Sequence, residues 1–317
     1  MIEPADDIQY SHDERHFGTS RRVLSRAATK GIARRIARGA YLSEAEWRNA
    51  NPRDRYVARV TAVALTRRTP AVVSHWSAAA FWDLPRLGEW PEAIQLTVPA
   101  SASSGSKNGI TKHRAVLLDD DVEEVGGIAI TSLGRTILDI AATSSFRDAV
   151  AAADAALRVD RYGRRPAMIT REQLETAWTR AQPMRAHART RAVLAFAETR
   201  AESPLESASR VTMRMIGVPR PLLQFAHYDD QGFIGETDFA WPEFRAVAEA
   251  DGDRKYLDPE FRNGRSAEQV FLDEKRREDR LRALGLQVAR WPWQVALSQR
   301  LLAERLGGIG LPTGCHW

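Results

Sequence analysis

The sequence predicts an α+β multidomain protein. With 317 residues, the chain is long enough for two or three domains that each bury a core. Segments with strand-like alternation, such as AIQLTVP at residues 93–99, lie between longer segments with helical periodicity. Breaks rich in glycine, proline and serine separate them, and AESPLES marks one near residue 200. We therefore expect four parts, which span residues 1–50, 51–160, 161–200 and 201–317.

The composition excludes several classes of protein. Hydrophobic residues make up 44% of the chain and charged residues 27%, which is ordinary for a globular protein. No apolar run approaches the ~20 residues of a membrane span, and the start, MIEPADDIQYSHDE, lacks the apolar region of a signal peptide. The single cysteine, Cys315, rules out an intrachain disulfide and a cysteine-rich zinc site. We expect a cytoplasmic protein with no membrane partner.

A basic cluster lies near the N-terminus. The formal net charge is +5, and no acidic residue occurs between residues 21 and 38. The cations of this stretch are Arg21, Arg22, Arg26, Lys30, Arg34, Arg35 and Arg38. Three of them recur at every fourth position and would share one helix face, which Gly31 would end.

The stretch IARRIARGAYL, which follows this helix, predicts two short strands turning at Arg38-Gly39. A basic helix followed by a basic hairpin is typical of a winged helix-turn-helix on double-stranded DNA. The alternative is a solvated cationic helix, because charge runs are weak motifs.

The middle of the chain predicts a small α/β domain followed by helices. Ser74 is a candidate N-cap, and we expect His75 beside it to be packed and hydrogen-bonded rather than catalytic. The small-residue run SASSGSKNG at residues 101–109 predicts a loop, and residues 147–200 predict helices. No GxGxxG or P-loop pattern occurs, so we expect no organic cofactor.

Two carboxylates face each other in a predicted hairpin near the C-terminus. GETDFAW and RAVAEAD predict strands joined at residues 242–244. Antiparallel pairing would place Asp238 beside Glu249, and two such carboxylates repel unless a cation lies between them. Mg²⁺ suits this arrangement, because it prefers oxygen ligands and keeps waters that attack phosphorus. Upstream, a helix is predicted from an N-cap at Ser203 to Gly217.

Two segments, VSHWSAAAFWDLP and ITSLGRTILDIAA, resemble the AbiEi-type antitoxins of actinobacteria. Three further segments, ESPLESASRVTMRMIGVP, GETDFAWPEFRAVAEADGDRKY and KRREDRLRALGLQVARW, resemble the very-short-patch-repair group of the PD-(D/E)XK nuclease fold. The resemblance implies an N-terminal winged helix, a small α/β middle domain, a helical bridge and a C-terminal restriction-endonuclease-like α/β domain. It also implies that Glu206 completes the acidic cluster, although Glu206 could serve only the helix dipole.

The sequence departs from these families in two places. The region before Arg21 is short and polar, so the first helices of the winged fold could be incomplete. The usual nuclease lysine, two residues after the second acid, is here Asp251, which could bind the metal directly or through a neighbouring group. Lys255 lies four residues further on and could orient the attacking water, or could be a surface lysine.

The last predicted helix runs from a cap at Ser266 to Gly285 and carries a second basic face. This face consists of Lys275, Arg276, Arg277 and Arg280, and it could follow a DNA backbone. The alternative is an ordinary salt-bridged helix, in which Glu274 and Arg277 pair at i, i+3. In the strand after it, Arg290 could face the site, whereas Trp291 belongs to the core.

The sequence therefore predicts a DNA-binding protein with an endonuclease domain of the short-patch-repair type. Mg²⁺ or Mn²⁺ would be held by Asp238, Glu249 and Glu206, with Asp251 and Lys255 as further catalytic residues. The alternative is an AbiEi-like antitoxin or transcriptional regulator. In that case the nuclease-type domain is inert and binds DNA or a partner such as a cognate toxin protein.

Overall fold

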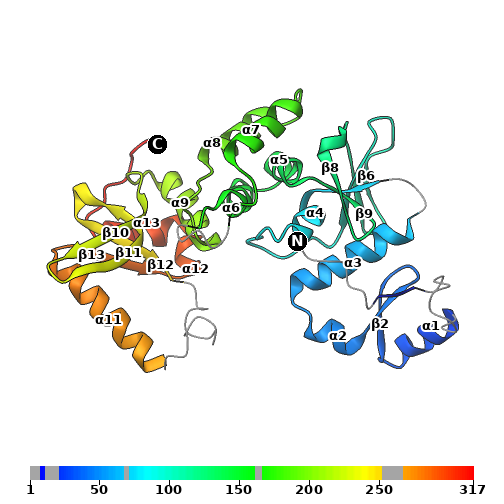
Figure 1. The fold of residues 1–317 in the computed structure, drawn as a ribbon, viewed down its shortest axis with the longest axis horizontal. Coiled ribbons are helices and arrows are strands. Elements are labelled where there is room, and N and C mark those ends of the chain that lie inside the picture. Colours follow the sequence, from blue (N-terminus) through cyan, green and yellow to red (C-terminus); the bar gives the residue numbers. More distant parts are fainter. Residues whose placement is uncertain (1–7, 11–20, 68–70, 161–165, 252–266) are drawn as a thin grey trace. The chain divides into compact units, whose positions relative to one another are not determined.

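The computed structural model describes residues 8–10, 21–67, 71–160, 166–251 and 267–317 (Figure 1). The protein is a mixed α/β structure, and its described strands form three sheets. The chain divides into two compact units, which are treated separately below. Unit 1 comprises Met1–Ser145 and Ile169–Val193, and unit 2 comprises Phe146–Met168 and Leu194–Trp317. None of the helices in the described ranges has the length and apolar character needed to cross a membrane.

Unit 1 begins with the basic helix and hairpin that the sequence predicts. The elements are β1 (Gln9–Tyr10), α1 (Arg21–Thr29), β2 (Ala33–Ala37), β3 (Ala40–Ser43), α2 (Glu44–Asn49) and α3 (Pro52–Thr66). The strands form an antiparallel sheet in the order β1-β3-β2. Helix α1 ends at Gly31, whose φ of 71° is left-handed, and the N–H of Ile32 donates to the carbonyl of Ala27 to close the end.

A six-stranded sheet forms the rest of unit 1, in the order β6-β7-β5-β4-β9-β8. Its strands are β4 (Val72–Val73), β5 (Ile94–Val98), β6 (Gly105–Lys107), β7 (Ile110–Arg114), β8 (Val122–Val125) and β9 (Ile128–Thr131). The associated helices are α4 (His75–Phe81), α5 (Leu133–Thr143) and α7 (Arg171–Arg180), with a 3-10 turn η1 at Asp119–Asp121.

The run at residues 101–109, predicted as a loop, contains strand β6. Asn108 and Gly109 have positive φ angles of 53° and 72°, as a type I′ turn requires, and they connect β6 to β7. The Asn-Gly pair was therefore a hairpin signal that the small-residue composition concealed.

The helices between residues 147 and 200 are shared by the two units. Helix α6 (Phe146–Leu157) belongs to unit 2, whereas α8 (His187–Phe196) continues from unit 1 into unit 2. Helix α6 is fixed to α9 (Pro204–Ile216) by a buried ion pair, in which Arg210 Nη1 lies 2.7 Å from Asp154 Oδ2. Ser207 Oγ and the N–H of Glu198 also donate to the Asp154 carboxylate.

Unit 2 contains a four-stranded sheet in the order β10-β11-β12-β13. The strands are β10 (Leu222–Asp229), β11 (Gly232–Trp241), β12 (Ala246–Ala250) and β13 (Gln287–Trp291), with a 3-10 turn η2 at Pro242–Phe244. The described helices that follow β12 in the chain are α11 (Ala267–Ala283), α12 (Trp293–Ala296) and α13 (Gln299–Gly307). Strands β11 and β12 form the predicted antiparallel hairpin, and β13 runs parallel to β12.

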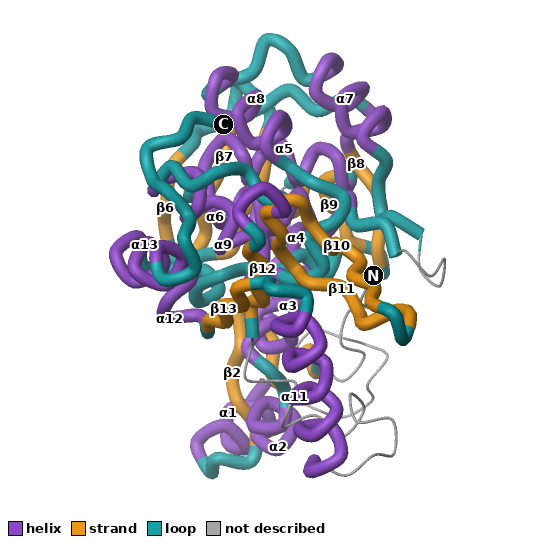
Figure 2. Tube along the Cα trace, turned by 90° about the vertical axis from the view of Figure 1, so that its left-hand side faces the viewer, coloured by secondary structure: helices purple, strands orange, loops and turns teal. Residues whose placement is uncertain are grey.

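The two faces of this sheet differ in chemistry. Phe239 and Trp291 are fully buried on one face, where they pack with Leu205 of α9 and Leu302 of α13. The opposite face carries Glu249 of β12, which side chains of α11 contact. Figure 2 distinguishes these helices and strands by colour. The apolar face stabilises the unit, and the second face carries the charged residues.

The Asp154–Arg210 ion pair provides a test of this packing. Burial raises the pKa of Asp154 to about 6 despite the neighbouring guanidinium. Arg210→Met leaves this carboxyl without its cation and should reduce the free energy of unfolding by about 3–5 kcal/mol. The double variant Asp154→Leu/Arg210→Met should recover most of the loss, because it removes both charges. Urea unfolding measures both values, and equal losses in the single and double variants would contradict the prediction.

Candidate active site

Strands β11 and β12 separate at the position of the predicted carboxylate pair. Their regular pairing ends at Phe239 opposite Ala248, one step before Asp238 and Glu249. Asp238 Oδ2 accepts the backbone N–H of Ala250 at 2.8 Å, so the carboxylate takes a hydrogen bond of β12 itself. Asp238 therefore lies at the fork between the strands, where a side chain replaces part of the backbone ladder.

Glu206 reaches the same fork from the first turn of α9. Ser203 is the N-cap, as predicted, and its hydroxyl accepts the N–H of Glu206 at 3.2 Å. Glu206 Oε2 in turn accepts the backbone N–H of Glu202 at 2.9 Å. These contacts hold the carboxylate in a fixed orientation, and only 4% of the residue is exposed. The helix-terminal role and the site role of Glu206 are thus compatible.

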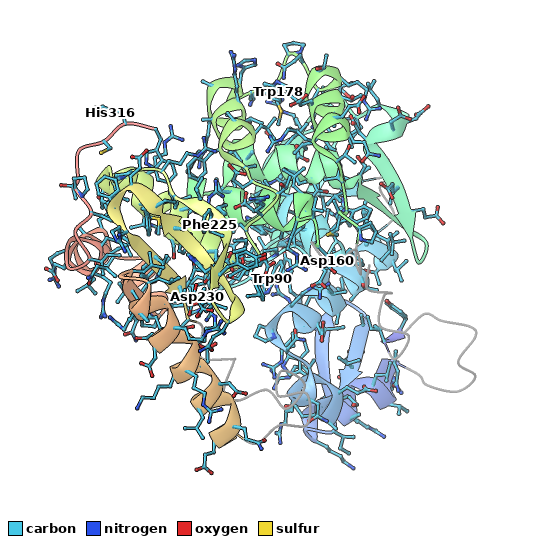
Figure 3. The ribbon with its side chains drawn as sticks, turned by 60° about the vertical axis from the view of Figure 1, so that its left-hand side comes forward. Trp90, Asp160, Trp178, Phe225, Asp230 and His316 are labelled. Carbon is cyan, nitrogen blue, oxygen red and sulfur yellow. The ribbon has the colours of Figure 1, made fainter. Side chains whose placement is uncertain are left out.

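Gln224 of β10 connects the two carboxylates. Its Nε2 donates to Glu206 Oε2 at 3.0 Å and to Asp238 Oδ1 at 3.3 Å. Strand β10 with its neighbour β11 is drawn in yellow in Figure 3, where Phe225, the next residue, is labelled. The structure thus brings Glu206 and Asp238 together around a side chain that the sequence did not indicate.

Burial makes this carboxylate pair electrostatically unfavourable when both groups are charged. The pKa of Glu206 is raised to about 8, first by burial and then by the Asp238 carboxylate. Near neutral pH the Glu206 carboxyl group therefore keeps its proton, unless a different cation binds there in place of the proton. A divalent cation is one such ion.

Glu249, by contrast, is held by arginines. Arg277 of α11 donates to Glu249 Oε1, and Arg290 Nη2 lies 2.9 Å from Glu249 Oε2. Arg277 also donates to the carbonyl of Glu236 and packs against Gly235, where an added Cβ would approach Arg277 Nε to 2.6 Å. The sequence predicts that Glu249 and Asp238 share one cation. In the structure, two guanidinium groups compensate the charge of Glu249 instead.

Arg290 of β13 is surrounded by acids. It stands opposite Glu249 in the parallel register of β12 and β13, and its side chain lies 3.3 Å from Asp251 and 2.8 Å from Glu274. Burial alone would lower the pKa of Arg290, but the carboxylates of Glu249, Glu274 and Asp251 outweigh it and raise the pKa. Asp251 is therefore an arginine partner here.

The remaining residues of the predicted site are more scattered. Lys255 lies outside the described residues. Arg280 forms two contacts with Asp229, at 2.8 and 2.5 Å, which offset its charge, whereas Lys275 and Arg276 are exposed on α11. Among the residues that the structure describes, no group of three or more His, Cys, Asp or Glu side chains is placed to hold a metal ion.

The N-terminal basic cluster remains largely exposed. The exposed cations are Arg22, Arg26, Lys30, Arg34, Arg35 and Arg38. The charge of Arg34 is offset by an acid, because two nitrogens of its guanidinium donate to Glu44, at 3.0 and 2.8 Å. The side chain of Arg21 lies outside the described residues. Helix α1 and the hairpin after it therefore present positive charge to the solvent.

A second polar cluster lies in unit 1 around His75, which is buried and hydrogen-bonded, as predicted. The ring nitrogen Nδ1 of His75 lies 2.9 Å from Ser74 Oγ and 3.9 Å from Asp139 Oδ2. In a catalytic triad the serine and the aspartate contact opposite ring nitrogens, so this geometry does not match one. Ser74 occupies the N-cap position of α4 but makes no capping bond. His113 stacks on His75 with ring centroids 3.6 Å apart, so their in-plane lone pairs cannot converge on one ion.

Burial lowers the pKa of His75 to about 3 and that of His113 to about 4. Both rings are therefore neutral at neutral pH. The cluster has the chemistry of a packed core element, and the candidate active site is the fork in unit 2.

Sequence reasoning missed Gln224 and Arg277 as parts of the site. The sequence around Gln224, PLLQFAHY, is a strand without a distinctive motif. Arg277 belongs to a charge-rich helix in which Glu274 and Arg277 also form the expected i, i+3 pair at 3.5 Å. Only the packing of the strands and of α11 selects these two side chains.

The pH dependence of stability tests the environment of Glu206. A carboxyl whose folded pKa lies above its ordinary value of 4.5 stabilises the fold when protonated. Its contribution is complete below about pH 4.5 and is lost as the pH rises to about 8. Glu206→Gln keeps a hydrogen-bond acceptor without a titrating group, so its unfolding free energy in EDTA should fall less than that of the wild type over this range. Parallel curves for the two proteins would contradict the raised pKa.

Part of the chain is similar to known proteins. No protein-family model matches the chain. It is 34% identical over 128 residues to two Mycobacterium tuberculosis proteins, from strains CDC 1551 / Oshkosh and ATCC 25618 / H37Rv, which both carry the name uncharacterized protein. The match covers 40% of this chain and 45% of each relative, so the similarity spans less than half of those proteins.

Proposed function

We propose that the protein binds double-stranded DNA and hydrolyses its phosphodiester bonds with a divalent cation. The observation that carries the proposal is the pair of carboxylates at the fork, Glu206 and Asp238, which are joined by one amide while burial raises the pKa of Glu206 to about 8. A site that places two acids together in this way favours a cation between them. The cytoplasm, where DNA is accessible, suits a chain with one cysteine.

The arrangement of elements supports the proposed fold. Among the described residues of unit 2, a helix, three antiparallel strands, a helix and a strand parallel to the third follow one another in the order α9-β10-β11-β12-α11-β13. We assign this arrangement to the restriction-endonuclease-like fold, in agreement with the family resemblance. In unit 1, a basic helix followed by a hairpin in a three-stranded sheet supports a winged helix, with an AbiEi-like α/β domain after it.

The residues at the fork fit Mg²⁺ or Mn²⁺. Carboxylate oxygens are the preferred ligands of these ions, and backbone N–H donors fix the carboxylates of Glu206 and Asp238. The ion would supply an activated water and positive charge near the scissile phosphate. Glu206 and Asp238, which the amide of Gln224 joins, would orient it.

A second candidate function is supported by Glu249. In the described structure this carboxylate forms ion pairs with Arg277 and Arg290. A unit that keeps this arrangement on DNA would bind without cutting. The protein would then act as an antitoxin-like transcriptional regulator, with DNA or a cognate toxin as its partner.

A plasmid-cleavage assay distinguishes the two functions. Supercoiled DNA would be incubated with the purified protein and Mg²⁺, Mn²⁺ or EDTA. We expect metal-dependent cutting that falls at least about 100-fold in Asp238→Asn, because a ligand of the cation is lost. Asp230→Asn, at the exposed turn between β10 and β11 (Figure 3), is the matched control and should cut normally. Absence of cutting, with DNA binding retained, would favour the regulator.

DNA binding by the N-terminal helix is tested separately. Arg22→Ala/Arg26→Ala should weaken duplex binding and reduce the slope of log affinity against log salt by about two, because two phosphate contacts are lost. Arg300→Ala/Arg305→Ala on α13 removes the same charge from unit 2 and is the control. Equal effects of the two double variants in fluorescence anisotropy would argue against a specific role of α1.

A further inference from the structure

Gln224 occupies an unusual position in the sheet. Strands β10 and β11 pair regularly at Leu223 with Phe239 and at Phe225 with Thr237, but not at the intervening position, Gln224 with Asp238. The φ angle of Gln224 is +49°, a left-handed conformation that residues other than glycine rarely adopt, least of all within a strand. The backbone is therefore distorted at the residue that contacts both carboxylates.

The distortion has a direct consequence for the side chain. It allows Nε2 of Gln224 to reach Glu206 Oε2 at 3.0 Å and Asp238 Oδ1 at 3.3 Å simultaneously. Glu206 belongs to α9 and Asp238 to β11, and the amide of Gln224 bridges these two separate elements. Strained backbone conformations persist where the surrounding structure holds them, and they are frequent at functional sites.

The chemistry of an amide suits a site that alternates between two states. Without a cation, the two N–H groups of an amide can donate to two carboxylates and reduce their repulsion. With a cation between the carboxylates, N–H groups directed at it would be unfavourable. Rotation about the terminal torsion of glutamine, which has a broad two-fold profile, directs the amide oxygen to the ion instead.

We propose that Gln224 is a positioning residue of the candidate active site. Without a cation, its amide N–H groups hold Glu206 and Asp238 together. When a divalent cation takes the place of these hydrogen bonds, the amide turns and directs its oxygen to the ion. The inference rests on the proposed function, since it assigns a role within that site. It adds a neutral oxygen donor to two carboxylates, a combination that hard cations such as Mg²⁺ and Mn²⁺ accept.

Mn²⁺ alone is the probe that tests this role. The full chain would be titrated with Mn²⁺, and the signal of the free ion would be followed by electron paramagnetic resonance. Gln224→Met removes the amide and should weaken Mn²⁺ binding by about 10–100-fold. Gln224→Glu keeps an oxygen donor at the same reach and should bind Mn²⁺ at least as tightly as the wild type. Gln287→Met, an exposed substitution on β13 of the same sheet, should have no effect.

Two further measurements separate positioning from stability. Gln224→Gly removes the side chain at a position where glycine accepts the left-handed backbone, so it should fold while it loses Mn²⁺ affinity to the same extent. In the cleavage assay, Gln224→Met should need about 10–100-fold more Mn²⁺ for half-maximal rate and should approach the wild-type rate at saturation. A purely structural role would be rescued neither by Mn²⁺ nor by Gln224→Glu.

The outcomes separate this inference from the proposed function. If Asp238→Asn loses Mn²⁺ binding but Gln224→Met and Gln224→Gly bind like the wild type, the role of Gln224 is refuted and the metal site stands. If Asp238→Asn, Gln224→Met and Gln224→Gly all lose Mn²⁺ binding and Gln224→Glu keeps Mn²⁺ binding, the inference is supported even where no cleavage is observed. If the wild-type protein binds no Mn²⁺, both the inference and the metal-dependent function are refuted.

Discussion

Carboxylates that leave water need hydrogen-bond donors or positive charge, and the C-terminal unit meets this need in two different ways. At the fork between β11 and β12, Glu206 and Asp238 accept hydrogen bonds from backbone N–H groups and from the amide of Gln224. On the face toward α11, Glu249 is served by two guanidinium groups. The donors named at the fork are neutral groups, whereas those at Glu249 are cations.

This difference determines what the unit can do chemically. Glu206, whose pKa burial raises to about 8, takes up either a proton or a cation, and at neutral pH the two compete for it. The carboxylate of Glu249 instead forms ion pairs with Arg277 and Arg290. Because Arg277 lies on α11 and Arg290 on β13, the availability of Glu249 depends on how α11 packs on the sheet.

The same principle separates the basic residues. Arg34 and Arg280 belong to predicted DNA-binding faces, yet each is paired with an acid, Glu44 or Asp229. Arg22 and Arg26 are exposed on α1, in a stretch without nearby acids in the sequence. Formal charge is the same in the two groups. Their capacity to attract a phosphate backbone is not, because a paired guanidinium must first leave its carboxylate.

The sequence by itself determined the local elements of this protein. Alternation and turn residues determined the β11–β12 hairpin, Ser203 and Gly217 determined the ends of α9, and the Arg38-Gly39 turn determined the N-terminal hairpin, because short-range backbone preferences are written in neighbouring residues.

Only the tertiary structure decided how the acids divide between Gln224 and the arginines. Glu206, Gln224 and Asp238 come from three different elements, and Arg277 reaches Glu249 across 28 residues of chain. No local pattern encodes such contacts, since they depend on where helices and strands pack after the chain has folded.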